Sequence, residues 1–172
     1  MPARVLVFCK QPIVGVTAAE VITELRDADL MTLAEVHDLP GGEEAAVKAM
    51  WNVFRIEDGQ PTINGASIVW HADQRPIQVA FGPPLDGELA ETLENFDDDE
   101  GPGPDRVRAH VAATVSILNL EMGITGSNDL AATISEVVAF YIAERFDGIV
   151  WFFYDEFAAP DDRGATLWDT RS

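Results

Sequence analysis

The chain has 172 residues, 30 of them acidic and 11 basic, which gives a formal net charge of −19. Hydrophobic residues make up 47% of it. This content excludes a disordered polyanion and predicts a folded acidic protein whose core forms without a metal or a disulfide. Such a negative surface is repelled by phosphate backbones and anionic lipids, so neither nucleic acid nor a membrane is an expected partner.

The single cysteine, Cys9, excludes an internal disulfide and a cysteine zinc knuckle. The first residues lack the basic start and apolar run of a signal peptide, and no apolar run approaches the roughly 20 residues that span a bilayer. The expected location is therefore the cytoplasm. Because Cys9 has no CxxC partner and no histidine near it in sequence, we expect a buried hydrophobe rather than a nucleophile.

The first third of the chain predicts two strands and two helices. Arg4–Cys9 is short and apolar, as strands are, and Thr17 and Glu20 have the spacing of a capping box that starts a helix. Met31–Val36 is the expected returning strand. Glu43–Phe54 has apolar residues at helical spacing behind two acidic first-turn residues, which predicts a second helix.

The middle of the chain changes to short β-branched runs separated by turn signals such as Asn64-Gly65. This pattern predicts a β-meander, with its clearest strands at Ala66–His71 and Ile77–Phe81. An amphipathic helix is expected at Asp86–Phe96. The run DDDEGPGPD, Asp97–Asp105, has no periodicity and predicts a solvated acidic loop.

The last third predicts a strand at Ala109–Leu118, where apolar residues alternate with small or polar ones. The stretch Asn128–Ala159 then predicts an amphipathic helix that buries one side, with Ser135 on its outer face. Gly148 is the expected helix stop. The apolar run Ile149–Tyr154 predicts a central strand covered on both faces.

The order of these elements predicts a single domain over residues 1–172 with an α+β layered fold, in which helices pack on a mixed β-sheet. Residues 1–60 and 105–172 share a strand, helix, strand plan around a central meander and helix at 61–96 and the acidic loop 97–105. A duplicated ferredoxin-like split βαβ arrangement fits this plan.

Three stretches carry a resemblance to a known family: VAFGPPLDGELAE (Val79–Glu91), AHVAATVSI (Ala109–Ile117), and the ATISEVVAFY helix leading into GIVWFFY (Ala132–Tyr154). Through them the chain resembles the bacterial family called domain of unknown function 4261. The resemblance implies a soluble bacterial α+β domain without an established activity, and it transfers no catalytic residue.

Few residues have the chemistry of a catalytic site. His110 is the best candidate for proton transfer, and Asp155 with Glu156 follows the central strand, where two carboxylates could bind a hard cation or act as acid and base. The structural alternatives, a hydrogen-bonded histidine and a solvated acidic pair, are favoured over these roles. His37 and His71 end predicted strands, but nothing brings the three histidines together, so no metal site or cofactor is expected.

The aromatic residues near the C-terminus have two interpretations. Trp151, Phe153, Tyr154 and Phe157 are expected in the core, although exposed aromatics also anchor partners. Trp168 lies in a polar tail, where a partner anchor and a packing side chain are equally favoured. Sequence motifs of nucleotide-binding loops, hydrolase nucleophile elbows and metalloprotease helices are absent from the sequence.

Two functional hypotheses follow. The first is a non-enzymatic acidic binding module, of the immunity or inhibitor type, that captures a basic protein partner through complementary charge. Its candidate partner-binding residues are Asp97, Asp98, Asp99, Glu100 and Trp168. The second is a small hydrolase or metal-dependent enzyme that uses His110 with Asp155 or Glu156 in one cleft. Oligomeric state is left open by the sequence.

Overall fold

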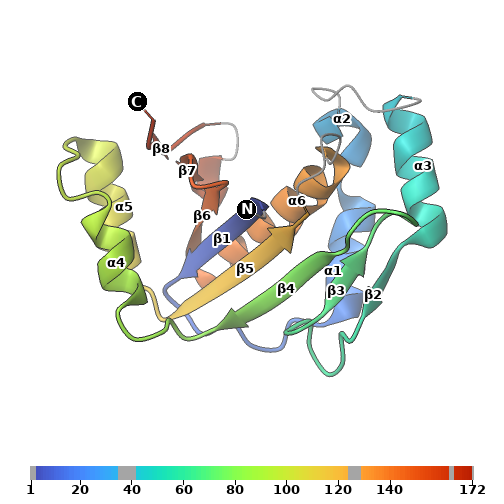
Figure 1. The fold of residues 1–172 in the computed structure, drawn as a ribbon, viewed down its shortest axis with the longest axis horizontal. Helices are drawn as coiled ribbons and strands as arrows, with labels where there is room; N and C mark the ends of the chain where they lie inside the picture. The colour runs from blue at the N-terminus through green and yellow to red at the C-terminus, as the bar shows by residue number, and fades with distance from the viewer. Residues whose placement is uncertain (1–2, 35–41, 124–128, 163–164, 172) are drawn as a thin grey trace. The chain divides into compact units, whose positions relative to one another are not determined.

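The computed structural model describes residues 3–34, 42–123, 129–162 and 165–171. These residues form six α-helices and eight strands (Figure 1), which confirms the α+β layered class. The helices are α1 (Ala18–Asp27), α2 (Leu30–Ala34), α3 (Glu43–Val53), α4 (Glu88–Glu94), α5 (Pro102–Ala112) and α6 (Asp129–Phe146), with a 3-10 turn η1 (Pro160–Asp162). The strands are β1 (Ala3–Cys9), β2 (Arg55–Glu57), β3 (Ser67–Val69), β4 (Ile77–Gly82), β5 (Ser116–Met122), β6 (Gly148–Phe152), β7 (Glu156–Ala158) and β8 (Trp168–Asp169).

The strands form one sheet in the order β2-β3-β4-β5-β1-β6-β7-β8. Every pairing whose register is described is antiparallel, where a mixed sheet was expected. No helix within the described ranges is long and apolar enough to cross a bilayer.

The chain divides into two compact units, each built from three separate stretches. Unit 1 comprises Met1–Arg4, Gly15–Ala80 and Leu120–Val138, and unit 2 comprises Val5–Val14, Phe81–Asn119 and Ala139–Ser172. These boundaries differ from the repeat halves 1–60 and 105–172 that the sequence pattern suggested. Because the stretches of the two units alternate along the chain, neither unit is a simple N-terminal or C-terminal half.

Unit 1 contains the predicted meander. Strand β2 pairs with β3, and β3 with β4, so that Ile68 lies opposite both Ile56 and Ile77. Helix α1 begins with the predicted capping box: Thr17 Oγ1 accepts from the Glu20 backbone N–H, and Glu20 Oε2 accepts from that of Thr17 at 2.9 Å. These two bonds satisfy amides that the first helical turn leaves unpaired.

The strand expected at Met31–Val36 is wrong, since Leu30–Ala34 is helix α2; Glu35 and Val36 lie outside the described residues. The cause is the Asp29 side chain, which accepts hydrogen bonds from the Thr32 backbone N–H and hydroxyl. Such a side-chain bond to the third residue on is a helix-starting contact. Leu30 and Ala34, four residues apart, are then buried on one face.

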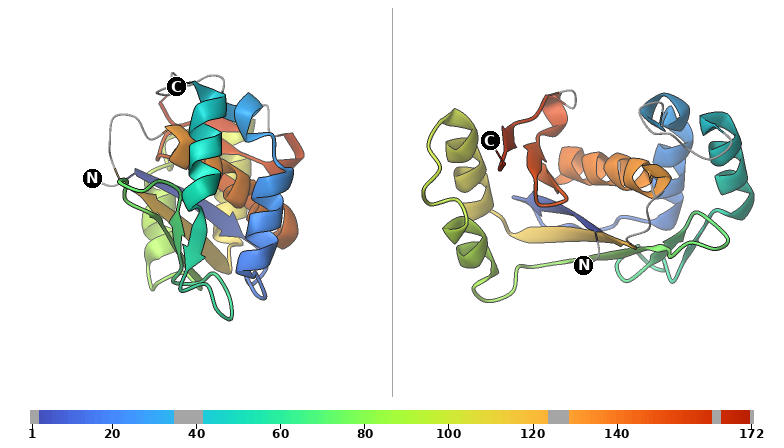
Figure 2. Two further views of the ribbon diagram at one scale, coloured as in Figure 1. Left: turned by 90° about the vertical axis from the view of Figure 1, so that its right-hand side faces the viewer. Right: turned by 45° about the horizontal axis from the view of Figure 1, so that its top comes forward.

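Unit 2 is organised around antiparallel strands β1, β6, β7 and β8 and an aromatic core. Trp151 of β6 lies opposite Phe157 of β7, which lies opposite Trp168 of β8. Helices α4 and α5 lie side by side in this unit (Figure 2), and α5 contacts β8. The core residues of the cluster are Phe8, Phe96, Val107, Val111, Ile117, Ile149, Trp151, Phe157, Ala159 and Trp168.

The strand expected at Ala109–Leu118 is also wrong in its first half, because helix α5 continues to Ala112 and β5 starts only at Ser116. The apolar pattern of this stretch fits the period of a helix as well as that of a strand. Val107, His110 and Val111 are three and four residues apart and are all buried on α5. Pro102 in the first turn and Asp105 near the helix start favour the helical alternative.

Helix α6 starts at Asp129 and is buried on more sides than predicted. Ser135, expected on the outer face, is fully buried and donates its hydroxyl to Met122 Sδ at 3.3 Å. A small polar side chain costs little to bury when it finds such a partner. The residues flanking α6 at its start, 124–128, lie outside the described part of the chain.

Strand β6 ends at Phe152, two residues earlier than predicted. Phe153 and Tyr154 adopt left-handed conformations, with φ of 53° and 63°, and each is 39% exposed. Two positive φ values fit the tight turn between right-twisted antiparallel strands. The expectation that both aromatic rings belong to the core is therefore wrong.

Candidate functional site

The acidic segment predicted as a loop lies between α4 and α5 in unit 2. Asp97, Asp98 and Glu100 are exposed and Asp99 is half-buried. The predicted loop extends too far, because residues 102–105 already form the first turn of α5. We call Asp97, Asp98, Asp99 and Glu100 the acidic loop.

The acidic loop is fixed at its base by the core and by one arginine. The residue before it, Phe96, is buried and makes edge-to-face contacts with Trp151 and Trp168. Arg108 Nη1 donates to the backbone carbonyls of Phe96 and Asp99, both at 2.6 Å, and its other nitrogen pairs with Asp105. The guanidinium therefore holds the loop backbone rather than its carboxylates.

This arrangement leaves the loop carboxylates available. None of the four forms an ion pair with any residue that the structure describes, although the basic side chain of Arg108 lies at the base of the loop. Four adjacent like charges raise the local negative potential, which attracts cationic groups. The loop is thus a defined and exposed concentration of negative charge.

Trp168, proposed with the loop as a partner anchor, is instead a packing side chain. It is 8% exposed, lies edge-to-face on Phe96 at 4.8 Å between ring centroids and stacks on Phe157. Gly103 of α5 lies so close that an added Cβ would come within 2.7 Å of the Leu167 carbonyl. Close approach of α5 to β8 buries the indole, so Trp168 is not available to a partner.

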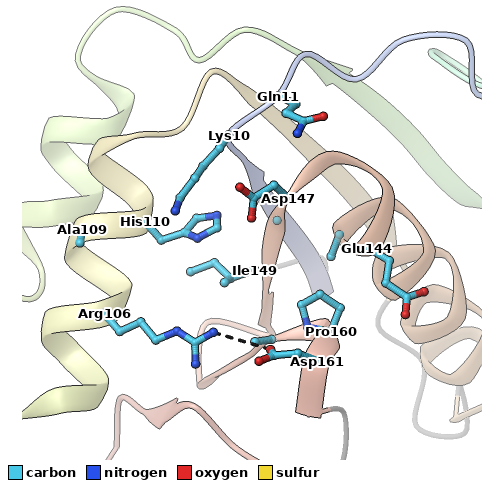
Figure 3. A pocket seen from close by; sticks show the side chains of 13 residues that line it. Lys10, Gln11, Arg106, Ala109, His110, Glu144, Asp147, Ile149, Pro160 and Asp161 are labelled. Carbon is cyan, nitrogen blue, oxygen red and sulfur yellow. Dashed lines mark ion pairs between the residues drawn. The ribbon is translucent and has the colours of Figure 1, made fainter.

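His110 lies on α5 and lines a pocket of about 730 Å³ in unit 2 (Figure 3). The two residues after β1, together with residues of α5, the end of α6, β6 and η1, surround this His110 pocket. Its polar lining residues are Lys10, Gln11, Arg106, His110, Glu144, Asp147 and Asp161.

The His110 ring is oriented by the main chain. Its Nε2 lies 2.9 Å from the Phe8 carbonyl oxygen, which only accepts, so Nε2 carries the proton and donates. Burial lowers the pKa of His110, and the positive charges of Lys10 and Arg106 lower it further against opposing contributions from the Phe8 carbonyl and Asp147. The ring is therefore neutral near pH 7, and Nδ1 is a hydrogen-bond acceptor.

Asp155 and Glu156 do not join His110. Asp155 lies in the β6–β7 turn, 3.5 Å from Arg171, and Glu156 accepts a hydrogen bond from the Thr166 hydroxyl at 3.0 Å. Neither carboxylate lines the His110 pocket. The hairpin that carries them directs β7 back along β6, so the strand end does not open into a shared cleft.

The other candidate residues have contacts that are typical of structural roles. His71 is exposed and its Nδ1 accepts from the Asp73 backbone N–H, while His37 lies outside the described residues. Among the residues described, no three His, Cys, Asp or Glu side chains are placed to hold a metal ion. Cys9 is fully buried, and burial with the nearby Asp147 raises the pKa of its thiol to about 12. It is an inert buried thiol, as its sequence context predicts.

Sequence reasoning missed Lys10, Arg106 and Asp147 as neighbours of His110. Arg106 had one available signal, since it lies one helical turn before His110, but it falls between the predicted loop Asp97–Asp105 and the predicted strand Ala109–Leu118. Lys10 and Asp147 are brought together by backbone bonds in which Lys10 N donates to the Asp147 carbonyl and Gln11 N to that of Phe146. Contacts across more than a hundred residues leave no local pattern in the sequence.

In comparisons with protein-family models, curated proteins and solved structures, nothing matches this chain. The resemblance to domain of unknown function 4261 stays a prediction. Functional inference therefore depends on the chemistry of the acidic loop and of the His110 pocket.

Proposed function

We propose that this protein is a non-enzymatic acidic binding module that captures a basic protein partner, as an immunity-type or inhibitory protein does. The observation that supports this most directly is the acidic loop, whose four carboxylates stay without ion pairs among the described residues while Arg108 holds its backbone. A partner's Lys and Arg side chains can pair with these carboxylates without first displacing an internal cation.

A cytoplasmic location also stays a prediction, and it depends on the single cysteine, Cys9.

The net charge of −19 supports the same proposal at long range. Complementary potentials raise association rates by steering a partner into the correct orientation before contact. The acidic loop strengthens the negative potential at one place on the surface of unit 2. Its attachment to the aromatic core through Phe96 limits the ordering entropy that binding would otherwise cost.

The alternative, a small hydrolase or metal-dependent enzyme, requires His110 and Asp155 or Glu156 in one cleft. The two carboxyl groups lie outside the His110 pocket, and each already has a partner, Arg171 or Thr166. This geometry supplies no acid and base pair from the three residues, so it favours the binding module.

A capture experiment tests the proposal. The tagged protein is incubated at low salt with an extract of its own cells, and retained proteins are eluted with a salt gradient. We expect a basic protein that is retained at low salt and released as salt rises, because screening weakens contacts between exposed charges. Replacing Asp97, Asp98, Asp99 and Glu100 by Asn or Gln should release it at lower salt.

A matched control separates the loop from total charge. The four exposed acids Asp27, Glu44, Asp58 and Asp73 of unit 1, replaced by Asn or Gln, change the net charge by the same amount. This dispersed variant should elute close to the parent. Recovery of no partner in repeated trials, or equal behaviour of the two variants, contradicts the proposed role of the loop.

A further inference from the structure

The His110 pocket has charges of opposite sign on its two sides. Lys10, His110 and Arg106 lie along one side in Figure 3, and Asp147 and Asp161 lie along the other, while the Glu144 side chain points away from the pocket. The volume of about 730 Å³ is within the range of roughly 300–1,000 Å³ that is typical of small-molecule sites. The size and the charge separation together indicate what kind of ligand fits.

The charges on the lining disfavour simple ions. An anion attracted by Lys10 and Arg106 would also meet the carboxylates of Asp147 and Asp161, and a cation attracted by those two carboxylates would meet the two basic side chains. A molecule with a carboxylate at one end and an ammonium at the other satisfies both sides. The lining also has apolar side chains that suit a short aliphatic group: Ala109, Ala143, Ile149, Ala159 and Pro160.

His110 provides a directed acceptor on this lining. Its Nε2–H is used by the Phe8 carbonyl, so the neutral ring offers the Nδ1 lone pair. Nδ1 has no hydrogen-bond partner among the described residues. It is also not fully buried. Nδ1 therefore keeps some accessible surface on a side chain that lines the pocket, and it can accept from an ammonium group.

Arg106 is held only weakly by the protein. Its ion pair with Asp161 spans 3.6 Å between exposed side chains, 54% and 71% exposed respectively. Exposed pairs of this kind contribute little to stability, so a ligand carboxylate can take the place of Asp161 at small cost.

We propose that the His110 pocket binds a small zwitterion of the aliphatic α-amino acid class. The ligand carboxylate lies at Arg106, and its ammonium lies at Asp147 and His110 Nδ1. This assignment is independent of the acidic loop and does not require the protein to be an enzyme.

The test follows the ring resonances of His110 by NMR in the full-length protein labelled at histidine, with the His110→Gln variant supplying the assignment. L-valine and L-alanine are titrated into the millimolar range, where weak small-molecule sites are half-filled. Acetate and ethylamine, each carrying one of the two charges, are titrated in the same way. We expect a saturable His110 shift with the amino acids, and at least tenfold weaker binding of each half-molecule. The exposed His71, which does not line the pocket, should not respond.

Variants give the proposal a sharper form. Arg106→Gln and Asp147→Asn should each weaken L-valine binding at least tenfold, whereas Asp161→Asn should strengthen it by removing the competitor for Arg106. A merely structural role of these exposed side chains predicts no such opposite effects. Thermal melting checks that each variant is folded. No saturable shift with either amino acid, or acetate binding as tightly as L-valine, overturns the proposal.

Discussion

The His110 side chain combines burial with a fixed tautomer, and both come from contacts remote in sequence. Phe8 supplies the acceptor for Nε2, and Lys10 and Arg106 supply the nearby positive charge. The residue type could be selected from the sequence, because histidine titrates near neutral pH. Its remote neighbours Phe8 and Lys10 could not, since Phe8 lies 102 positions away. Asp155 and Glu156 show the converse, because their adjacency in sequence indicated a pair that acts with His110, whereas the structure gives them other partners, Arg171 and Thr166.

The lowered pKa of His110 predicts a contribution to pH-dependent stability. The unfolded chain binds a proton at this residue as pH falls through about 6.5, while the folded state resists it, so stability is present above that pH and lost below it. The free energy of unfolding of the parent should therefore fall more between about pH 7.5 and 5.5 than that of His110→Gln. The difference cannot exceed about 1.4 kcal/mol per pH unit for one proton.

Urea denaturation of both proteins at several pH values measures this difference. The charged side chains near the ring, Lys10, Arg106 and Asp147, are present in both proteins, so their contributions largely cancel. Parallel pH profiles for parent and variant would mean that native His110 takes up a proton as readily as the unfolded chain does.

At the scale of elements, the sequence predicted the helices, turns and caps that depend on contacts between residues close together in the chain. The capping box of α1, the meander turns and helix α3 were recognisable because each depends on residues a few positions apart. The strands expected at Met31–Val36 and Ala109–Leu118 failed, since short apolar runs fit a helix and a strand equally well. A side-chain cap at Asp29 and a proline at the start of α5 decided these two cases.

Gly148 follows α6, as predicted, but its physical role differs from the one expected. It was expected to end α6 through its backbone freedom, but the residue with positive φ after the helix is Asp147, at 53°. An added Cβ at Gly148 would lie 2.9 Å from Val7 Cγ1 and 3.0 Å from both Ala143 Cα and Cys9 Sγ. The glycine is required for close packing of β6 at the end of α6.

We expect Gly148→Ala to destabilise the protein by about 1–3 kcal/mol, because overpacking forces the strand and helix apart. Gly82→Ala is the matched control, since nothing lies within 4 Å of an added Cβ at that strand position. Chemical denaturation of both variants measures the difference. A Gly148→Ala protein as stable as the parent would show that β6 has more space beside α6 than the contacts indicate.

The aromatic core of unit 2 predicts a contrast between two side chains near the C-terminus. Trp168 is packed between Phe96 and Phe157, so Trp168→Ala should cost about 3–5 kcal/mol, as large-to-small core substitutions do. Phe153 lies in an exposed turn, so Phe153→Ala should cost less than about 1 kcal/mol. Similar midpoints of denaturation for the two variants would contradict the placement of one of these rings.

At the scale of the whole molecule, charge is the property most readily taken from the sequence and the one on which the proposed function depends. The composition gives the net charge of −19, but it does not show which carboxylates a partner can reach. The structure adds that Arg108 binds the backbone of the acidic loop and leaves its carboxylates without ion pairs among the described residues. Fixed exposed charge favours rapid association, because a steered encounter needs little rearrangement afterwards.

The most direct test is the association rate of the captured basic protein, measured by stopped-flow at salt concentrations from about 0.05 to 0.5 M, over which the Debye length shrinks from more than ten to a few ångströms. The parent rate should fall steeply with salt, and the variant neutralised at Asp97, Asp98, Asp99 and Glu100 should show a clearly shallower dependence. The variant neutralised at the four dispersed acids should follow the parent. A rate that ignores salt, or a loop variant with the same salt dependence as the parent, would contradict capture through the acidic loop.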